Sequence, residues 1–228
     1  MKGLAHFISF DSETDFAKSP EYPFQRDKGY NAANGSLPLE SATYTTDAGP
    51  FGRVVGGNFN NITAYEQIQW LQADLAAVNR TKTPWVIAIA HRPMYSTNGA
   101  SYLPNIRASF QAAMLAGGVD LFFAGHIHWY ERMYPITANG TVDAASVIDG
   151  NTYRTNPGVS MTHIVNGMAG NIESHSTYGG ALVPTTAVLD QEHYGFSKLS
   201  IANASSLTVQ FMRGDGAGVS DQVTLIKK

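Results

Sequence analysis

Two stretches of this 228-residue chain are strand-like and are followed within two residues by histidine, and this pattern limits the folds that the chain can adopt. Residues 85–90 are continuously apolar and His91 follows them, while the segment 119–124 leads to His126 and His128. A continuous apolar run of this length is typical of a strand in a parallel sheet that is covered on both faces. The carboxyl ends of parallel strands share one edge of the sheet, where ligands bind in open α/β folds. We therefore expect the three imidazoles at one ligand-binding edge.

Two helices are predicted between the strands of this sheet. The first follows a predicted strand at residues 6–10 and begins with a capping box, in which Thr63 is the N-cap and Glu66 stands three residues later. Its apolar face recurs at helical spacing, at Ile68, Leu71, Leu75 and Val78. The second helix spans about residues 104–115 and ends at Gly117-Gly118. The sequence therefore predicts two strand–helix–strand crossovers, an arrangement typical of parallel sheets.

The pattern changes beyond Arg132. Short apolar segments are separated there by Asn-Gly, Asp-Gly and Gly-Asp pairs, which are typical of turns, and the predicted strands are residues 133–136, 161–165, 197–202 and 207–212. We expect this half to be antiparallel sheet that forms a second layer. Residues 18–61 show no sustained periodicity, which predicts a long surface loop near the site. The predicted fold is a single α/β domain over residues 1–228, with mixed sheets and helices outside.

The composition argues against several classes of protein. The net charge is −3 and no stripe of Lys and Arg occurs, so we expect no nucleic-acid binding. No apolar run approaches the roughly 20 residues that a membrane helix needs, so we expect no membrane partner. The chain contains no cysteine, which excludes a disulfide framework, a thiolate nucleophile and a zinc–cysteine site.

Acceptor sequons for N-glycosylation occur at five positions: Asn34, Asn61, Asn79, Asn139 and Asn203. Glycosylation of a secreted protein explains them, and so does the Asn-, Ser- and Thr-rich composition of the predicted loops. Residues 1–10 do not have the pattern of a signal peptide. Either the protein stays inside the cell or its true amino terminus lies elsewhere.

The histidines predict a metal site. In extended backbone, residues i and i+2 face the same side, so His126 and His128 can point into one pocket. Imidazole is the commonest neutral metal ligand. A site with three histidines and no cysteine favours zinc, or iron or manganese if oxygen ligands join it. Acidic residues within 11–16 could supply such ligands, although solvated loop carboxylates are the interpretation that composition favours.

Several blocks of the sequence resemble one family. Residues 90–96 (AHRPMYS) and 124–132 (AGHIHWYER) resemble the last two metal-binding blocks of purple acid phosphatases, which belong to the calcineurin-like metallophosphoesterases. Residues 166–173 (NGMAGNIE) resemble the family's glycine-rich block after the metal histidines, and residues 6–16 resemble the segment after its Gly-Asn-His block, in the fungal form. The resemblance covers essentially the whole chain and implies the family's α+β sandwich.

The resemblance implies a dinuclear centre that hydrolyses phosphate monoesters. His91 and His126 would bind the divalent ion, which is zinc, iron or manganese, and His128 would bind iron(III). Metal-bound hydroxide would attack the phosphorus, because two nearby ions clamp a phosphate and make hydroxide available near neutral pH. The backbone of His126, Ile127 and His128 would approach the phosphate.

Three residues after the second histidine block, Tyr130, Glu131 and Arg132, would hydrogen-bond the metal-bound imidazoles or pack around them. The histidine that protonates the leaving group in plant and animal members has no counterpart within residues 96–104. His175 and His193 are the candidates that remain for this role, although the sequence favours ordinary surface histidines at both positions.

The family's early blocks, Gly-Asp-x-Gly, Gly-Asp-x-x-Tyr and Gly-Asn-His, do not occur in this sequence. We therefore expect the chain to be the carboxyl-terminal portion of a secreted acid phosphatase, without the amino-terminal βαβ portion and the oxygen ligands that it carries. Two alternatives stay open at this point. One is a phosphodiesterase or nucleotidase of the same superfamily, and the other is a non-catalytic metallophosphoesterase fragment.

Overall fold

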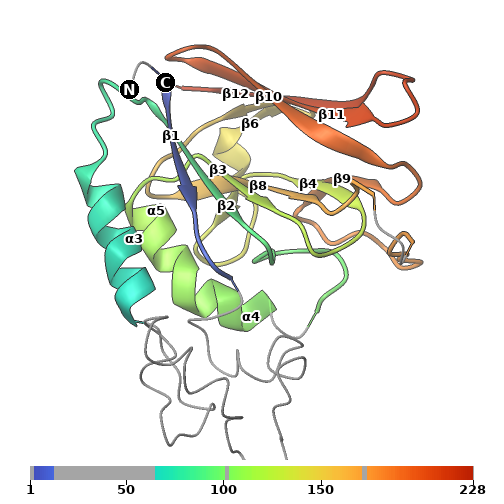
Figure 1. Cartoon of the computed structure of the whole chain (residues 1–228), viewed down its shortest axis with the longest axis horizontal. Coiled ribbons are helices and arrows are strands. Elements are labelled where there is room, and N and C mark those ends of the chain that lie inside the picture. Colours follow the sequence, from blue (N-terminus) through green and yellow to red (C-terminus); the bar gives the residue numbers. More distant parts are fainter. Residues whose placement is uncertain (1–2, 13–64, 101–102, 171–173, 228) are drawn as a thin grey trace, which may run out of the picture.

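A computed structural model describes residues 3–12, 65–100, 103–170 and 174–227 (Figure 1). Two β-sheets lie one above the other, and the helices cover the face of the first sheet that points away from the second (Figure 1). This layered arrangement confirms the predicted mixed α/β sandwich with helices outside. Within the described ranges, no helix is both long enough and apolar enough to cross a membrane.

The first sheet contains the strands that lead into the histidines. Its strand order is β1-β2-β3-β8-β4-β9, with β5 paired to β8 outside this path. The strands β1, β2, β3 and β8 run parallel, and β4 runs antiparallel to both β8 and β9. The bounds are β1 (Ala5–Ser9), β2 (Trp85–Ala90), β3 (Leu121–Ala124), β4 (Tyr130–Met133), β5 (Ile136–Thr137), β8 (Ser160–Asn166) and β9 (Thr186–Asp190). The parallel pairing of β1, β2 and β3 confirms both predicted crossovers.

The helices that make these crossovers are α3 (Tyr65–Ala77) and a continuous helical stretch, which comprises α4 (Leu103–Ile106), a π-helical turn (Arg107–Gln111) and α5 (Ala112–Ala116). The predicted apolar face of α3 packs into the core beneath the first sheet. Gly117 ends the second stretch against α3, where a Cβ atom would lie 2.6 Å from the Cβ of Leu75. Gly118 follows with φ of 67°, a conformation that favours glycine. Thr63 and the Glu66 side chain lie outside the described residues, so the capping box stays a prediction.

The second sheet has the order β10-β11-β12-β7-β6. Its strands are β6 (Val147–Asp149), β7 (Thr152–Arg154), β10 (Gly195–Asn203), β11 (Ser206–Arg213) and β12 (Val219–Ile226), and a 3-10 turn (Ala144–Ser146) precedes β6. Buried side chains from both sheets form one cluster between them, including Ile87 and Leu121 from the first sheet and Val209, Phe211 and Leu225 from the second. This shared core supports the single-domain prediction, which we keep as a proposal.

Three expectations about the second half were wrong in detail. The predicted strand at residues 133–136 is interrupted, because Pro135 has no backbone N–H and separates the end of β4 from the start of β5. The predicted strand at 161–165 lies within β8, which pairs in parallel with β3 and so belongs to the first sheet. The second sheet is not wholly antiparallel either, because β12 and β7 run parallel. The predicted loop at residues 18–61 lies outside the described residues.

Candidate metal centre

His91 and His126 meet at the carboxyl ends of two neighbouring strands. His91 directly follows β2, and the Gly125 backbone N–H after β3 donates to the His91 carbonyl over 2.9 Å. This bond holds the two chain segments together. The Nε2 atom of His91 then lies 3.0 Å from Nδ1 of His126, with the two rings nearly perpendicular. The parallel sheet therefore brings two of the three predicted ligands into direct contact.

The backbone between β3 and β4 is bent and not extended, so the premise that His126 and His128 face one side as in a strand is wrong. Two tight turns follow each other, because Ile127 N donates to Gly125 O and Trp129 N donates to Ile127 O, each over 2.8 Å. His126 itself has φ of 67°, in the left-handed region that non-glycine residues seldom occupy. Such outliers concentrate at functional sites, where the surrounding structure holds them.

His128 is held by a segment that follows β8. The Nδ1 atom of His128 lies 3.2 Å from the Ser174 carbonyl oxygen, which can only accept a hydrogen bond. Nδ1 therefore carries the proton, and Nε2 is the ring nitrogen whose lone pair could bind a metal. The His128 backbone N–H donates to Ser176 Oγ over 3.1 Å, and Ser176 N donates to His128 O over 2.9 Å. Sequence reasoning did not identify Ser174 or Ser176, and no local pattern marks them.

The spacing of His91 and His126 fits two ligands of one shared cation. Two imidazole nitrogens that bind one tetrahedral zinc ion at about 2.0–2.1 Å stand roughly 3.3 Å apart, which is close to the 3.0 Å between His91 and His126. Burial, followed by the charge of Arg92 and the neighbouring imidazoles, lowers the pKa of His126 to about 4. The ring is therefore neutral and can act as a ligand. Within the described ranges, no three His, Cys, Asp or Glu side chains form a group that could hold a metal ion.

Glu131 is completely buried and joins the two histidine segments. Its carboxylate accepts hydrogen bonds from Ser96 Oγ (2.8 Å) and Thr97 N (2.9 Å), which lie on the loop after His91. It also accepts from the Trp129 indole (3.1 Å) beside His128, and from Thr186 Oγ1 on β9 (2.6 Å). These contacts support a role for Glu131 in positioning His91 and His128 through the loop after His91 and through Trp129.

Tyr130 and Arg132 point away from the first sheet toward the second. The Tyr130 hydroxyl donates to Asp221 on β12 over 2.8 Å, and Arg132 forms a buried ion pair with the same carboxylate. Of the proposed proton donors, His175 stacks against Tyr194 with ring centroids 4.2 Å apart, whereas His193 pairs with Asp190 over 3.0 Å. The three supporting residues and the two proton-donor candidates stay proposals.

The sequence placed Gly167 only within a glycine-rich block. The structure shows why a glycine is required at this position. A Cβ atom at this position would lie 2.2 Å from the Ile127 carbonyl oxygen and 3.3 Å from His128 Cα. Both are backbone atoms of the histidine turn, so they cannot move aside as a flexible side chain could. Only glycine lets this turn approach the end of β8.

Replacement of Gly167 by alanine is therefore expected to displace the histidine turn. We expect the free energy of unfolding to fall by about 1–3 kcal/mol, as for other overpacked sites, and Zn²⁺ affinity to fall with it. Urea denaturation and Zn²⁺ titration measure the two effects. Gly179→Ala is the matched control, because a Cβ atom there meets nothing within 4 Å. Equal behaviour of the two variants would show that the turn does not depend on this contact.

Comparison with known proteins places the chain in a family. The sequence matches the family described as calcineurin-like phosphoesterase over residues 11–130, and the family described as iron/zinc purple acid phosphatase-like protein C over residues 160–222. It is 53% identical over 227 residues to an acid phosphatase of Aspergillus ficuum, covering 99% of this chain and 36% of that protein. It is 31% identical to acid phosphatase A of Cryphonectria parasitica, covering 99% of this chain and 38% of that protein.

Comparison with solved structures supports the same family. A purple acid phosphatase from yellow lupin seeds superposes with a TM-score of 0.63 at 28% identity, covering 72% of this chain and 28% of that one. The chain thus spans little more than a third of the length of the two fungal relatives. The phosphoesterase match alone covers more than half of the 228 residues. The chain therefore belongs to the calcineurin-like phosphoesterase family, as a member of its purple acid phosphatase branch.

Proposed function

We propose that this chain supplies the histidine side of a dinuclear metal centre in an acid phosphatase that hydrolyses phosphate monoesters. The observation that carries the proposal is the His91–His126 contact of 3.0 Å at the carboxyl ends of parallel strands. The 53% identity to an acid phosphatase supports the same activity. The substrates are small phosphomonoesters.

Each histidine has a defined part in this proposal. His91 Nε2 and His126 Nδ1 hold the divalent ion, which is zinc, iron or manganese, and His128 holds iron(III) through Nε2. When bound, two such ions clamp a phosphate and make a water molecule nucleophilic near neutral pH. The backbone at Ile127 lies between the ligands and faces the phosphate. His175 or His193 donates the proton to the leaving group.

The chain also contributes charge and rigidity to this centre. The Arg92 side chain is buried, and its charge acts on His126, so a phosphate at this edge would lie near a fixed cation. Glu131 locks the loop after His91 to Trp129. These contacts orient the ligands before a metal or substrate arrives, which lowers the cost of binding.

Metal-dependent phosphate binding tests the proposal. Isothermal titration of inorganic phosphate into the Zn²⁺-loaded chain is expected to show binding that disappears after EDTA treatment and in His126→Ala. His6→Gln is the control, because His6 pairs with Asp74 on α3 and lies outside the site. A metal-loaded chain that does not bind phosphate would favour a non-catalytic metallophosphoesterase fragment instead.

Measurements of substrate hydrolysis distinguish the remaining functional hypotheses. We expect little hydrolysis of p-nitrophenyl phosphate by this chain alone, because its described residues contain no group of three potential metal ligands. Robust metal-dependent hydrolysis would overturn that expectation. Preferential cleavage of bis(p-nitrophenyl) phosphate would favour the phosphodiesterase reading.

We further propose that the protein is secreted and glycosylated. Three of the sequon asparagines are exposed: Asn79 follows α3, Asn139 lies in the turn after β5, and Asn203 is the last residue of β10. Asn34 and Asn61 lie outside the described residues. Exposed positions in loops and at strand ends are accessible to glycosylation. Mass spectrometry of the protein secreted by a fungal host would detect a glycan at these sites. Their complete absence from secreted protein would contradict the proposal.

A further inference from the structure

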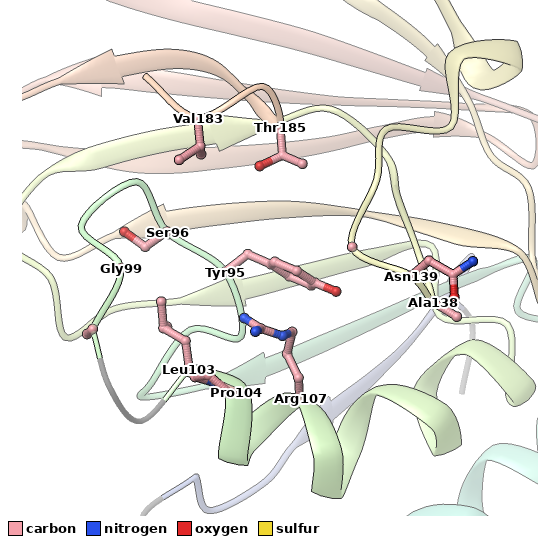
Figure 2. A pocket seen from close by; sticks show the side chains of 12 residues that line it. Tyr95, Ser96, Gly99, Leu103, Pro104, Arg107, Ala138, Asn139, Val183 and Thr185 are labelled. Carbon is pink, nitrogen blue, oxygen red and sulfur yellow. The ribbon is translucent and has the colours of Figure 1, made fainter. Parts of the chain in front are cut away.

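A cavity is lined in part by the loop that follows His91. It has a volume of about 470 Å³, and its walls come from that loop, the start of α4, the turn after β5 and residues 183–185 (Figure 2). This volume lies within the usual range for pockets that bind small molecules. None of the histidines discussed above lines it.

Arg107 gives this cavity its charge. It is half-buried and is the single charged residue among the twelve that line the cavity, all of them within the described part of the chain. Its Nη1 atom donates to the Met94 carbonyl over 2.8 Å, and its guanidinium carbon lies 4.8 Å from the centre of the Tyr95 ring. Figure 2 shows Arg107 and Tyr95 side by side at the centre of the cavity.

Among the described residues, no carboxylate lines the cavity beside Arg107 to neutralise its charge. The Tyr95 hydroxyl donates to Gln111 Oε1 over 2.5 Å, and burial, partly offset by the charge of Arg107, raises the pKa of Tyr95, so the phenol is neutral. A guanidinium has five N–H donors in a planar fork, and the Met94 carbonyl uses one of its nitrogens. A half-buried cation in a concave site without a carboxylate in its lining is an electrostatic match for an anion.

The remaining walls combine aliphatic side chains with polar ones, so part of the cavity can contact an apolar ligand body. Leu103 is 3% exposed, and Pro104 and Val183 add further aliphatic surface, while Asn139 and Thr185 place polar groups toward the rim. The single positive charge of Arg107 matches a ligand with one negative charge. A carboxylate and a phosphate can both accept two parallel hydrogen bonds from a guanidinium, but one cation balances the charge of a carboxylate and leaves one charge of a phosphate dianion unbalanced.

We propose that this cavity binds a small organic carboxylate, with the carboxylate on Arg107 and the apolar body against Leu103, Pro104 and Val183. The site is separate from the metal centre and does not depend on the proposed phosphatase function. It touches the same loop, because Ser96 lines the cavity while its hydroxyl donates to Glu131.

Titration of benzoate into the metal-free chain tests this site. The chain is produced in bacteria, so that Asn139 at the rim carries no glycan, and isothermal titration is carried out at neutral pH with EDTA present. We expect one saturable site for benzoate. Benzamide has the same ring without the charge and is expected to bind roughly tenfold more weakly, and inorganic phosphate is expected not to compete.

Two variants locate the binding. Arg107→Met keeps the length of the side chain and is expected to weaken benzoate binding at least roughly tenfold. Ala138→Tyr adds a ring at an exposed rim position and is expected to block the cavity without disturbing the core, which keeps the test valid if the first variant folds poorly. Arg213→Met is the control, because Arg213 pairs with Asp215 on an exposed turn. Undetectable benzoate binding, equal binding of benzamide, competition by phosphate, or unchanged affinity in Ala138→Tyr would overturn the proposal.

Discussion

Replacement of Arg132 by methionine is expected to lower the free energy of unfolding by about 3–5 kcal/mol, because it leaves the Asp221 carboxylate buried without its ion partner. Arg132 lies on β4 of the first sheet and Asp221 on β12 of the second. The guanidinium is 1% exposed, and its Nε and Nη2 atoms contact the two carboxylate oxygens at 2.6 and 2.9 Å. The pair therefore connects the two sheets at their shared core.

The neighbouring groups make this pair difficult to replace. Arg132 also donates to the Gly150 carbonyl, Asn151 Oδ1 and the Tyr153 hydroxyl, while Tyr130 donates to Asp221. Urea denaturation measures the effect. Arg213→Met breaks an exposed pair and is expected to change stability by less than about 1 kcal/mol. An equally small effect of Arg132→Met would mean that the sheets do not depend on this contact.

His163→Phe is expected to remove a large pH-dependent contribution to stability. The His163 ring is 2% exposed, and among the described residues neither ring nitrogen has a hydrogen-bond partner. Its neighbours are the Tyr95 and Phe122 rings, with centroids 5.0 and 5.7 Å away. Burial, followed by the charge of Arg107, lowers the pKa of His163 to about 3.

The direction of the pH dependence follows from the pKa values of His163 in the folded and in the unfolded chain. The unfolded chain takes up a proton at this histidine below a pKa of about 6.5, whereas the folded chain does so only near 3. Stability is therefore lost as the pH falls from about 6.5 toward 3, and the loss is about 2 kcal/mol at pH 5. Urea denaturation of both proteins between pH 7 and pH 4 measures it. Other titrating groups are common to both proteins, so parallel stability curves would contradict this account of His163.

The crossovers and the His91–His126 pair could be predicted because they depend on local patterns. Continuous apolar runs mark covered strands, the repeat of Ile68, Leu71 and Leu75 marks a helix face, and parallel strands end at one edge. The strand β12 was not predicted. Its inward residues are regularly spaced, but polar residues such as Asp221 interrupt the apolar pattern, and Asp221 is explained only by Arg132 on another sheet.

The finer parts of the site depend on contacts between distant segments. The left-handed backbone of His126, the hold of residues 174–176 on His128, and the close approach of Gly167 to Ile127 all arise from packing. No spacing within one segment specifies them. The role of Glu131 shows the same limit, since a buried carboxylate next to a histidine motif suggests an imidazole partner, but its bonds go to Ser96, Thr97, Trp129 and Thr186.

Zn²⁺ titration of the purified chain tests the central claim most directly. We expect one weakly bound ion per chain, and His91→Ala and His126→Ala are each expected to weaken its binding at least roughly tenfold, because each removes one of two paired ligands. His6→Gln is expected to bind Zn²⁺ like the unaltered chain, since its partner is Asp74. Equal Zn²⁺ affinity in the unaltered chain and in His126→Ala would contradict the proposed site. Two tightly held ions per chain would contradict the expectation that this chain alone binds a single ion weakly.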